Sequence, residues 1–270
     1  MERGYVTTRD GQMHYREDGN GNTTVVLLHQ ALRSSLEYKR VVPFLRDRAR
    51  VISVDLMGYG DSDAPPRHYD IPAHAERVHD LLRQLRVEQV CLVGHHTGGN
   101  VAIEVAAQFP RAVERLVLSG PAFVLDAAER NELVTKMSAI EYPSPVADGS
   151  HLQSIWNEGL ISSFDVPRIP PTEPELLADF FLEQIRVGPR RKEAHIAAFS
   201  HLAAPSLTKI SVPILIIVGD DDMWACRRWE EMLEVQPKAR LVRLPTAGEA
   251  PRLMPQRFAE LIASHLDHSG

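Results

Sequence analysis

A short stretch around residue 95 constrains the fold of this chain more than any other. Four apolar residues, 90–93, have the composition of a buried strand, and an apolar helix pattern begins at Asn100. Between them, Gly94 and Gly98 bracket a three-residue turn with His96 at its centre. Glycine permits the positive φ angles and close backbone approaches that such a turn needs. The stretch therefore predicts a strand that turns sharply into a helix and holds His96 in a strained, outward-pointing position.

Strand and helix patterns alternate along most of the chain, which is the organisation of a mostly parallel sheet with right-handed connections. Thr23 to Leu28, for example, is a continuous apolar run of the kind that is buried on both faces. The expected strands are 5–8, 12–16, 23–28, 51–55, 90–93, 115–118, 214–218 and 241–244. The expected helices are 35–47 (capped by Ser35), 72–86, 100–107 and 255–266.

The alternation stops once, between Phe123 and about Pro205. This segment has helical and polar character, is interrupted by proline-rich stretches, and contains no buried strand pattern. An α/β chain interrupted by one helical segment predicts a core with an inserted cap. We expect residues 1–122 and 206–270 to form the core and residues 123–205 to form the cap.

Composition excludes several classes of function. The chain has 270 residues and a formal net charge of −6, without a run of lysines or arginines, so we expect no nucleic-acid partner. No segment is apolar enough to serve as a signal peptide or to cross a membrane. Two cysteines, Cys91 and Cys226, do not make a disulfide framework, which favours a cytoplasmic protein. We expect a monomer or homodimer.

Six stretches occur in an order and spacing that resemble the α/β-hydrolase superfamily over nearly the whole chain. They read V-V-L-L-H-Q-A-L-R-S-S-L-E-Y, V-I-S-V-D-L-M-G-Y-G-D-S, L-V-G-H-H-T-G-G-N-V-A, R-L-V-L-S-G-P, V-P-I-L-I-I-V-G-D-D-D and L-P-T-A-G-E-A-P-R-L-M-P. The resemblance implies an α/β-hydrolase fold, with a mostly parallel central sheet flanked by helices and an inserted helical cap. It does not define the reaction, because this fold hosts many chemistries.

The resemblance also implies three catalytic positions, in the order nucleophile, acid and histidine base. In this chain they hold His96, Asp222 and Glu249. The acid is conventional, although Asp220 or Asp221 could fill the same place. The other two positions depart from the family pattern, because an imidazole replaces the usual serine and a carboxylate replaces the usual histidine. Glu249 and Asp222 could form a carboxylate pair against His96, or Glu249 could orient a neutral His96.

Other positions could contact a ligand. The resemblance implies that the backbone N–H groups of Ala31 and Thr97 form an oxyanion hole, and the Thr97 hydroxyl is a less favoured nucleophile. Gln30 could donate to a substrate oxygen or brace its loop. His151 and Trp156 fall in the cap, where they could line the roof of the pocket. No spacing supports a metal site, and we expect no cofactor.

These features favour an enzyme that acts on a small, apolar or aromatic carbonyl compound, ester or lactone. His96 would perform acid–base chemistry of the lyase, isomerase or cyclase type, or would activate water for hydrolysis, without an acyl-serine intermediate. Two alternatives stay open. One is a catalytically silent small-molecule binding protein on the same fold. The other is an ester or lactone hydrolase with a non-standard triad.

Overall fold

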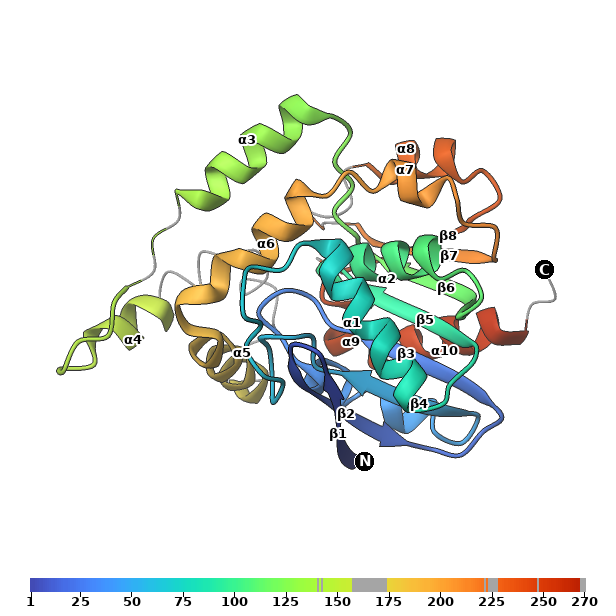
Figure 1. Cartoon of the computed structure of the whole chain (residues 1–270), viewed down its shortest axis with the longest axis horizontal. Helices are drawn as coiled ribbons and strands as arrows, with labels where there is room; N and C mark the ends of the chain where they lie inside the picture. The colour runs from blue at the N-terminus through green and yellow to red at the C-terminus, as the bar shows by residue number, and fades with distance from the viewer. Residues whose placement is uncertain are drawn as a thin grey trace.

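A computed structural model describes residues 1–139, 141, 143–156, 174–220, 222, 228–246 and 248–267. Its centre is a twisted eight-stranded sheet in the order β1-β2-β4-β3-β5-β6-β7-β8 (Figure 1). The strands are β1 (Glu2–Thr8), β2 (Gly11–Asp18), β3 (Thr23–Leu28), β4 (Ala49–Val54), β5 (Val90–His95), β6 (Val113–Ser119), β7 (Ile214–Gly219) and β8 (Arg240–Leu244). β2 pairs antiparallel with β1 and β4, and the remaining neighbours are parallel. The fold class expected from the sequence is confirmed.

Helices cover both faces of the sheet. Along β3, Val26 and Leu28 join the core beneath α1 (Ile71–Gln84) and α2 (Thr97–Gln108). The alternate residues, Val25 and Leu27, join a second core with Phe258 of α10 (Pro255–Asp267), on the opposite face (Figure 1). Burial on both faces explains why these strands are continuous apolar runs in the sequence.

Parallel register brings the loops of the predicted site to one edge of the sheet. Leu28 of β3 pairs with Gly94 of β5, and His95 of β5 pairs with Ser119 of β6. The loops that follow β3, β5 and β6 therefore begin side by side, and those after β7 and β8 continue the same edge. This is the edge at which open α/β sheets bind their ligands.

Between β6 and β7, the described residues contain helices and no strand. These are α3 (Ala127–Ser138), α4 (Ser150–Ser154), α5 (Pro174–Val187), the 3-10 turn η5 (Gly188–Arg190), α6 (Arg191–Ser200) and α7 (Ala204–Leu207). Helices α3 to α6 lie together to one side of the sheet, on the left in Figure 1. The boundaries expected for the cap, 123–205, stay a prediction. None of the described helices is both long and apolar enough to span a bilayer.

One predicted helix is wrong. Instead of a helix over 35–47, the chain forms two 3-10 turns, η1 (Ser35–Tyr38) and η2 (Val42–Phe44). Pro43 lacks an N–H and its ring would clash with the preceding turn of an α-helix, so the segment cannot continue as one helix. The cap residue is Ser34, whose hydroxyl accepts the Leu36 N–H, and not Ser35. Two short helices near the C-terminus, α8 (Trp229–Val235) and α9 (Ala250–Leu253), were not predicted.

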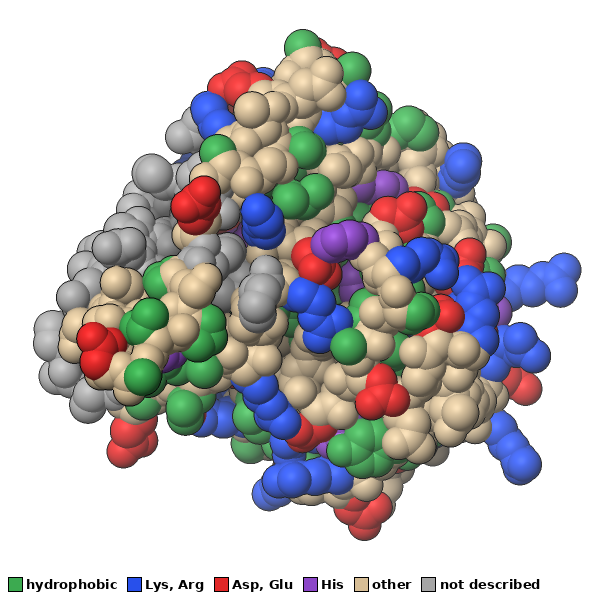
Figure 2. Space-filling model, turned by 60° about the vertical axis from the view of Figure 1, so that its left-hand side comes forward, with side chains coloured by type: hydrophobic (Ala, Val, Ile, Leu, Met, Phe, Trp, Pro, Cys, Tyr) green, Lys and Arg blue, Asp and Glu red, His purple; other side chains and the backbone are tan. Residues whose placement is uncertain are grey.

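The surface carries no large patch of one charge on the face that Figure 2 draws. Acidic and basic side chains are interspersed there, with hydrophobic side chains between them. This agrees with the modest net charge of −6.

Candidate active site

The turn after β5 holds His96 in a strained backbone conformation, at φ 45° and ψ −112°. The turn leaves no room for side chains at the two bracketing positions, and only glycine fits there. A Cβ on Gly94 would lie 2.2 Å from the Gly98 carbonyl oxygen, and a Cβ on Gly98 would lie 2.2 Å from the Leu28 carbonyl oxygen. The sharp turn expected from the sequence is therefore present, and His96 immediately precedes α2.

Both ring nitrogens of His96 have hydrogen-bond partners. Nε2 lies 2.9 Å from Asp222 Oδ2, and Nδ1 lies 3.0 Å from Gln30 Oε1. The side chain of His96 is 18% exposed and that of Asp222 is 4% exposed, so a ligand would reach the imidazole first. Of the three candidate acids, Asp222 is the one in contact with His96, whereas Asp220 pairs with Arg243 on the surface and Asp221 lies outside the described residues.

Glu249 contacts Gln30, which in turn contacts His96. The carboxylate pair of Glu249 with Asp222, one of the two arrangements considered from the sequence, is not seen among the described residues. Gln30 Nε2 donates to Glu249 Oε1 at 2.5 Å, while Glu249 Oε2 has no hydrogen-bond partner among the described residues. Glu249 is fully buried. The four side chains thus form one chain of contacts in the order Asp222, His96, Gln30 and Glu249.

Two close glycines explain how the His96 and Asp222 side chains fit together. A Cβ on Gly120 would lie 2.7 Å from Asp222 Oδ2 and 2.8 Å from His96 Cδ2. A Cβ on Gly248 would lie 2.9 Å from Asp222 Oδ2 and 3.1 Å from His96 Nε2. The loops after β6 and β8 therefore enclose the imidazole–carboxylate pair with bare backbone.

A buried ion pair lies next to His96. His95 Nδ1 hydrogen-bonds to Glu37, and His95 Nε2 donates to the Gly248 carbonyl oxygen at 2.5 Å. Burial disfavours charge on both groups, yet their mutual attraction is stronger, so the pKa of His95 rises to about 9 and that of Glu37 falls to about 2. Glu37 also accepts the Gln30 backbone N–H at 3.0 Å. His95 is therefore a buried residue with both ring nitrogens hydrogen-bonded.

A second group of charges, which the sequence did not reveal, surrounds Glu249. Arg33 Nη2 lies 3.9 Å from Glu249 Oε1, and Arg252 Nε lies 4.0 Å from Oε2. Both guanidinium groups lie over the ring of Phe180 in α5, at 3.7 and 4.3 Å from its centroid. Arg252 also pairs with Glu183 of the same helix at 2.5 Å. These contacts fasten the cap helix α5 to the loop that carries Glu249.

The two predicted oxyanion donors lie on either side of the turn. Ala31 follows Gln30 in the loop after β3, and Thr97 begins α2; both residues are buried. Neither backbone N–H donates to another residue in the described part of the chain. Their role stays a prediction.

Of the two predicted cap contacts, neither shows a contact with His96 in the described residues. His151 lies in α4, at the outer end of the cap in Figure 1, and its Nδ1 accepts the Val146 N–H at 3.2 Å. Trp156 packs edge-on against Phe181 of α5, at 5.2 Å between ring centroids. Trp156 therefore belongs to the cluster that holds α5 in place, and ligand binding by either residue stays a prediction.

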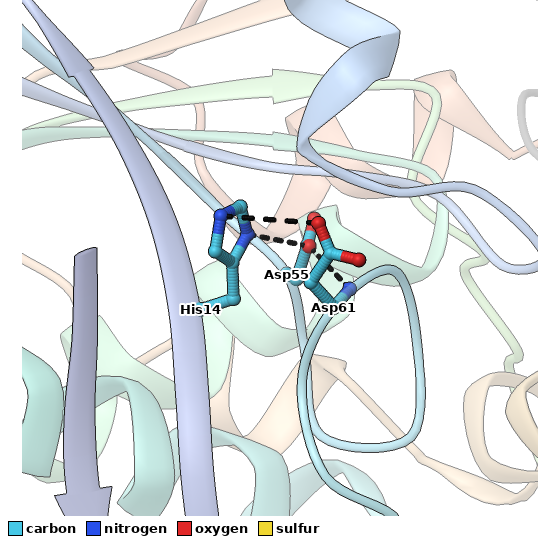
Figure 3. A group of neighbouring side chains, drawn as sticks. All are labelled: His14, Asp55 and Asp61. Atoms are coloured by element: carbon cyan, nitrogen blue, oxygen red, sulfur yellow. Dashed lines mark hydrogen bonds and ion pairs between the residues drawn. The ribbon is translucent and has the colours of Figure 1, made fainter. Parts of the chain in front are cut away.

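A separate cluster, His14, Asp55 and Asp61, has the residue types of a metal site (Figure 3). Most of its potential ligand atoms are already engaged, although His14 Nε2 has no hydrogen-bond partner among the described residues. Both oxygens of Asp55 accept hydrogen bonds, from His14 Nδ1 at 2.8 Å and from two backbone N–H groups. Asp61 pairs with Arg186 of α5, and His14 Nε2 lies 4.0 Å from it. The positive charge of Arg186 beside Asp61 disfavours a bound cation there. We therefore interpret the cluster as a structural link between β2 and the cap.

Comparisons with known proteins agree with the fold. A family model described as alpha/beta hydrolase fold matches residues 23–251. An uncharacterized protein of Mycobacterium tuberculosis is 40% identical over 104 residues, and the match covers 38% of this chain and only 30% of that protein. A putative 2-succinyl-6-hydroxy-2,4-cyclohexadiene-1-carboxylate synthase of Bacillus subtilis is 26% identical over 96% of this chain and 98% of its own.

Among solved structures, the enol-lactonase from Burkholderia xenovorans superimposes with a TM-score of 0.80 at 22% identity, covering 98% of this chain and 100% of that one. At this identity the likeness concerns the fold. Together with the family match over residues 23–251, it completes the assignment: this chain belongs to the α/β-hydrolase fold family.

Proposed function

We propose that this protein is an enzyme that acts on a small carbonyl compound, ester or lactone, and that His96 performs acid–base chemistry at the position where its relatives carry a nucleophile. The observation that carries the proposal is the contact of 2.9 Å between His96 Nε2 and Asp222 Oδ2. An imidazole oriented by a carboxylate is the proton-transfer unit of this family's usual triad. Here the imidazole comes from the turn after β5 and keeps the same acid as its partner.

The placement of His96 supports a working site more than a decayed one. A strained backbone angle at a non-glycine residue costs about 1–3 kcal/mol and persists where the surrounding structure holds it. Here the glycines 120 and 248 leave space for the imidazole, and both of its nitrogens are paired. A small residue would fill the same position without these requirements.

The proposed chemistry is proton transfer at an oxygen or carbon beside a carbonyl group. His96 would give a proton to the substrate, and the backbone N–H groups of Ala31 and Thr97 would stabilise negative charge on its oxygen. The same parts could serve addition of water to an ester or lactone. The synthase and the lactonase among the similar proteins carry names from both kinds of reaction.

A panel of three assays tests the proposal: hydrolysis of p-nitrophenyl esters, opening of γ-lactones, and exchange of the α-protons of keto acids in heavy water. We expect the purified protein to accelerate at least one reaction and His96→Ala to abolish the acceleration without loss of folding. His68→Ala is the matched control, because that side chain is 79% exposed and pairs with Glu193, which is not part of the group around His96. Equal rates for His96→Ala and the unchanged protein would refute the proposal.

One observation favours a binding protein as the second candidate. Both ring nitrogens of His96 are engaged by protein groups, so neither is free to receive a proton before a partner moves. Saturable binding of panel compounds by calorimetry, with no turnover in any of the three assays, would support this candidate instead.

A further inference from the structure

Gln30 occupies a bridging position between the buried carboxylate of Glu249 and the imidazole of His96. Its Nε2 lies 2.5 Å from Glu249 Oε1 and its Oε1 lies 3.0 Å from His96 Nδ1. The Gln30 side chain is buried, and its backbone N–H is held by Glu37. Both ends of the amide are therefore engaged within the protein.

The orientation of this amide follows from the chemistry of its neighbours. An ionised carboxylate only accepts hydrogen bonds, whereas a carboxamide donates through nitrogen and accepts through oxygen. The Gln30 nitrogen must therefore face Glu249, since the opposite orientation would bring two oxygens together at 2.5 Å. The Gln30 oxygen is left facing His96 Nδ1, which must donate to it.

The second nitrogen of the same ring faces another acceptor, Asp222 Oδ2 at 2.9 Å. A neutral imidazole donates through one nitrogen only and would leave one of these acceptors opposite a lone pair. The doubly protonated ring satisfies both. The hydrogen-bond pattern, and not the Asp222 contact alone, thus selects the imidazolium form of His96.

We propose that Glu249 is a positioning residue: by accepting the Gln30 amide hydrogen, it fixes the Gln30 carbonyl oxygen against His96 Nδ1 and holds the resting site with His96 as an imidazolium. This inference deepens the function proposed above and rests on it for its catalytic meaning. The histidine position of the family triad would then have become an orienting carboxylate.

The charges around the ring are compatible with this state. His95 lies against His96, with ring centroids 4.2 Å apart, but its charge is matched by Glu37. Asp222 faces Nε2 directly. Glu249 lies behind Gln30, and Arg33 and Arg252, at 3.9 and 4.0 Å from it, supply the positive charge that a buried carboxylate requires.

The proposal defines the order of proton transfers. His96 gives the Nδ1 proton to the substrate oxygen as that oxygen gains negative charge, which breaks the hydrogen bond from Nδ1 to Gln30 Oε1, and the ring keeps its Nε2 proton toward Asp222. The neutral ring then presents an Nδ1 lone pair to the Gln30 carbonyl oxygen, an unfavourable contact that drives recovery of the proton from the product or water. Acid catalysis therefore comes first, and activation of water by a neutral resting His96 is disfavoured.

Nitrogen NMR of the resting protein tests the proposal without any substrate. The protein is labelled with ¹⁵N-histidine, and His96 is assigned by difference from His96→Gln among the 12 histidines. At a pH of about 8, where an ordinary histidine is neutral, we expect both ring nitrogens of His96 to resonate as protonated nitrogens. A neutral His96 in the unchanged protein would overturn the inference, whatever the outcome of the activity assays.

Two variants test the relay itself. Gln30→Met removes the acceptor, and Glu249→Gln lets the Gln30 amide adopt either orientation, so in both we expect His96 to become neutral under the same conditions. The signals of His95, which stays paired with Glu37, report that the protein remains folded. Gln108→Met is the matched control, because Gln108 also donates to a glutamate, Glu104 at 2.7 Å, but lies at the far end of α2. A doubly protonated His96 in both variants would contradict a role for Glu249.

Discussion

At the scale of single residues, two substitutions of His96 distinguish the energetic cost of its backbone conformation from the contribution of its imidazole to stability. His96→Gly and His96→Ala both lose the contacts with Asp222 and Gln30, but only glycine adopts φ 45° without strain. We predict that His96→Gly is more stable than His96→Ala by about 1 kcal/mol, measured by urea unfolding. Equal stabilities would mean that the turn relaxes when the imidazole is removed.

The ion pair between His95 and Glu37 predicts a specific pH dependence of stability. The pKa of His95 is raised from 6.5 to about 9, so its contribution is complete below pH 6.5 and is lost as the pH rises through 9. The pKa of Glu37 is lowered from 4.5 to about 2, so its contribution is lost only as the pH falls through 2. Unfolding free energy should therefore decline between pH 6.5 and 9.

Glu37→Gln isolates this contribution, because it keeps the shape of the side chain and removes its charge. Loss of one partner of a buried ion pair should cost about 3 kcal/mol near neutral pH and flatten the decline above pH 6.5. Glu132→Gln is the control, since Glu132 pairs with Lys136 on the exposed surface, where the loss of an ion pair should leave the stability nearly unchanged. An unchanged pH profile in Glu37→Gln would contradict the assignment.

The individual site residues divide into those with a sequence signal and those without one. His96 follows from the spacing of Gly94 and Gly98, and Asp222 from its place after a buried strand. Glu37 and Arg33 have no such signal, because their contacts are with residues far away along the chain. Glu249 was recognised, but its link through Gln30 depends on side-chain geometry that a one-dimensional pattern does not contain.

At the scale of secondary-structure elements, the close approach of α2 to β3 depends on one glycine. A Cβ on Gly98 would lie 2.2 Å from the Leu28 carbonyl oxygen, which is backbone and cannot move aside. We predict that Gly98→Ala costs about 3 kcal/mol or more. Gly99→Ala in the same helix would meet Pro121 Cβ at 3.0 Å and the Gly94 carbonyl oxygen at 3.3 Å, both much longer than the contact at Gly98, and it gains helix propensity, so its effect should stay within about 1 kcal/mol. Urea unfolding of the two variants distinguishes these outcomes.

Helix α5 of the cap contacts the core through Phe180, whose ring is contacted by the guanidinium groups of Arg33 and Arg252, as well as through ion pairs such as Arg252–Glu183. Phe180→Ala should weaken this attachment by about 3 kcal/mol and accelerate amide hydrogen exchange across 174–187 by about 100-fold. Exchange in the central strands should not change. Leu182→Ala on the same helix is the control, because Leu182 is 63% exposed; an equal effect there would show that Phe180 has no special role.

The elements themselves could be predicted where one strong pattern acts alone. Strand 23–28 and the helix before Arg86 follow from continuous or periodic burial, and the structure places them as β3 and α1. The prediction of one helix over 35–47 is wrong because it rests on Ser35 as a helix cap, whereas Pro43 prevents a continuous helix. The cap helices have weaker apolar periodicity, so the sequence indicated helical character there without defining each element.

At the scale of the whole molecule, the order of the strands brings the three positions that the family resemblance implies to one edge of the sheet. The loops after β5, β7 and β8 still bring residues 96, 222 and 249 into one connected group. In the proposed site, the residue type at two of these positions differs from the family pattern. If the fold alone sets the geometry, the usual side chains should work when they are put back.

The double variant His96→Ser with Glu249→His tests this expectation by restoring a serine, a histidine and Asp222. A Cβ built on Gly248 would lie 2.9 Å from Asp222 Oδ2. Gly248 is next to position 249, so the new histidine would start close to the Asp222 carboxylate. We predict that the double variant gains hydrolysis of p-nitrophenyl acetate with an initial burst, the sign of an acyl-enzyme. Each single variant lacks either nucleophile or base and should show neither, and adding Asp222→Asn should remove most of the gain. A double variant no faster than the single ones would mean that Gln30, Arg33 and Arg252 have adapted the site to a carboxylate at 249.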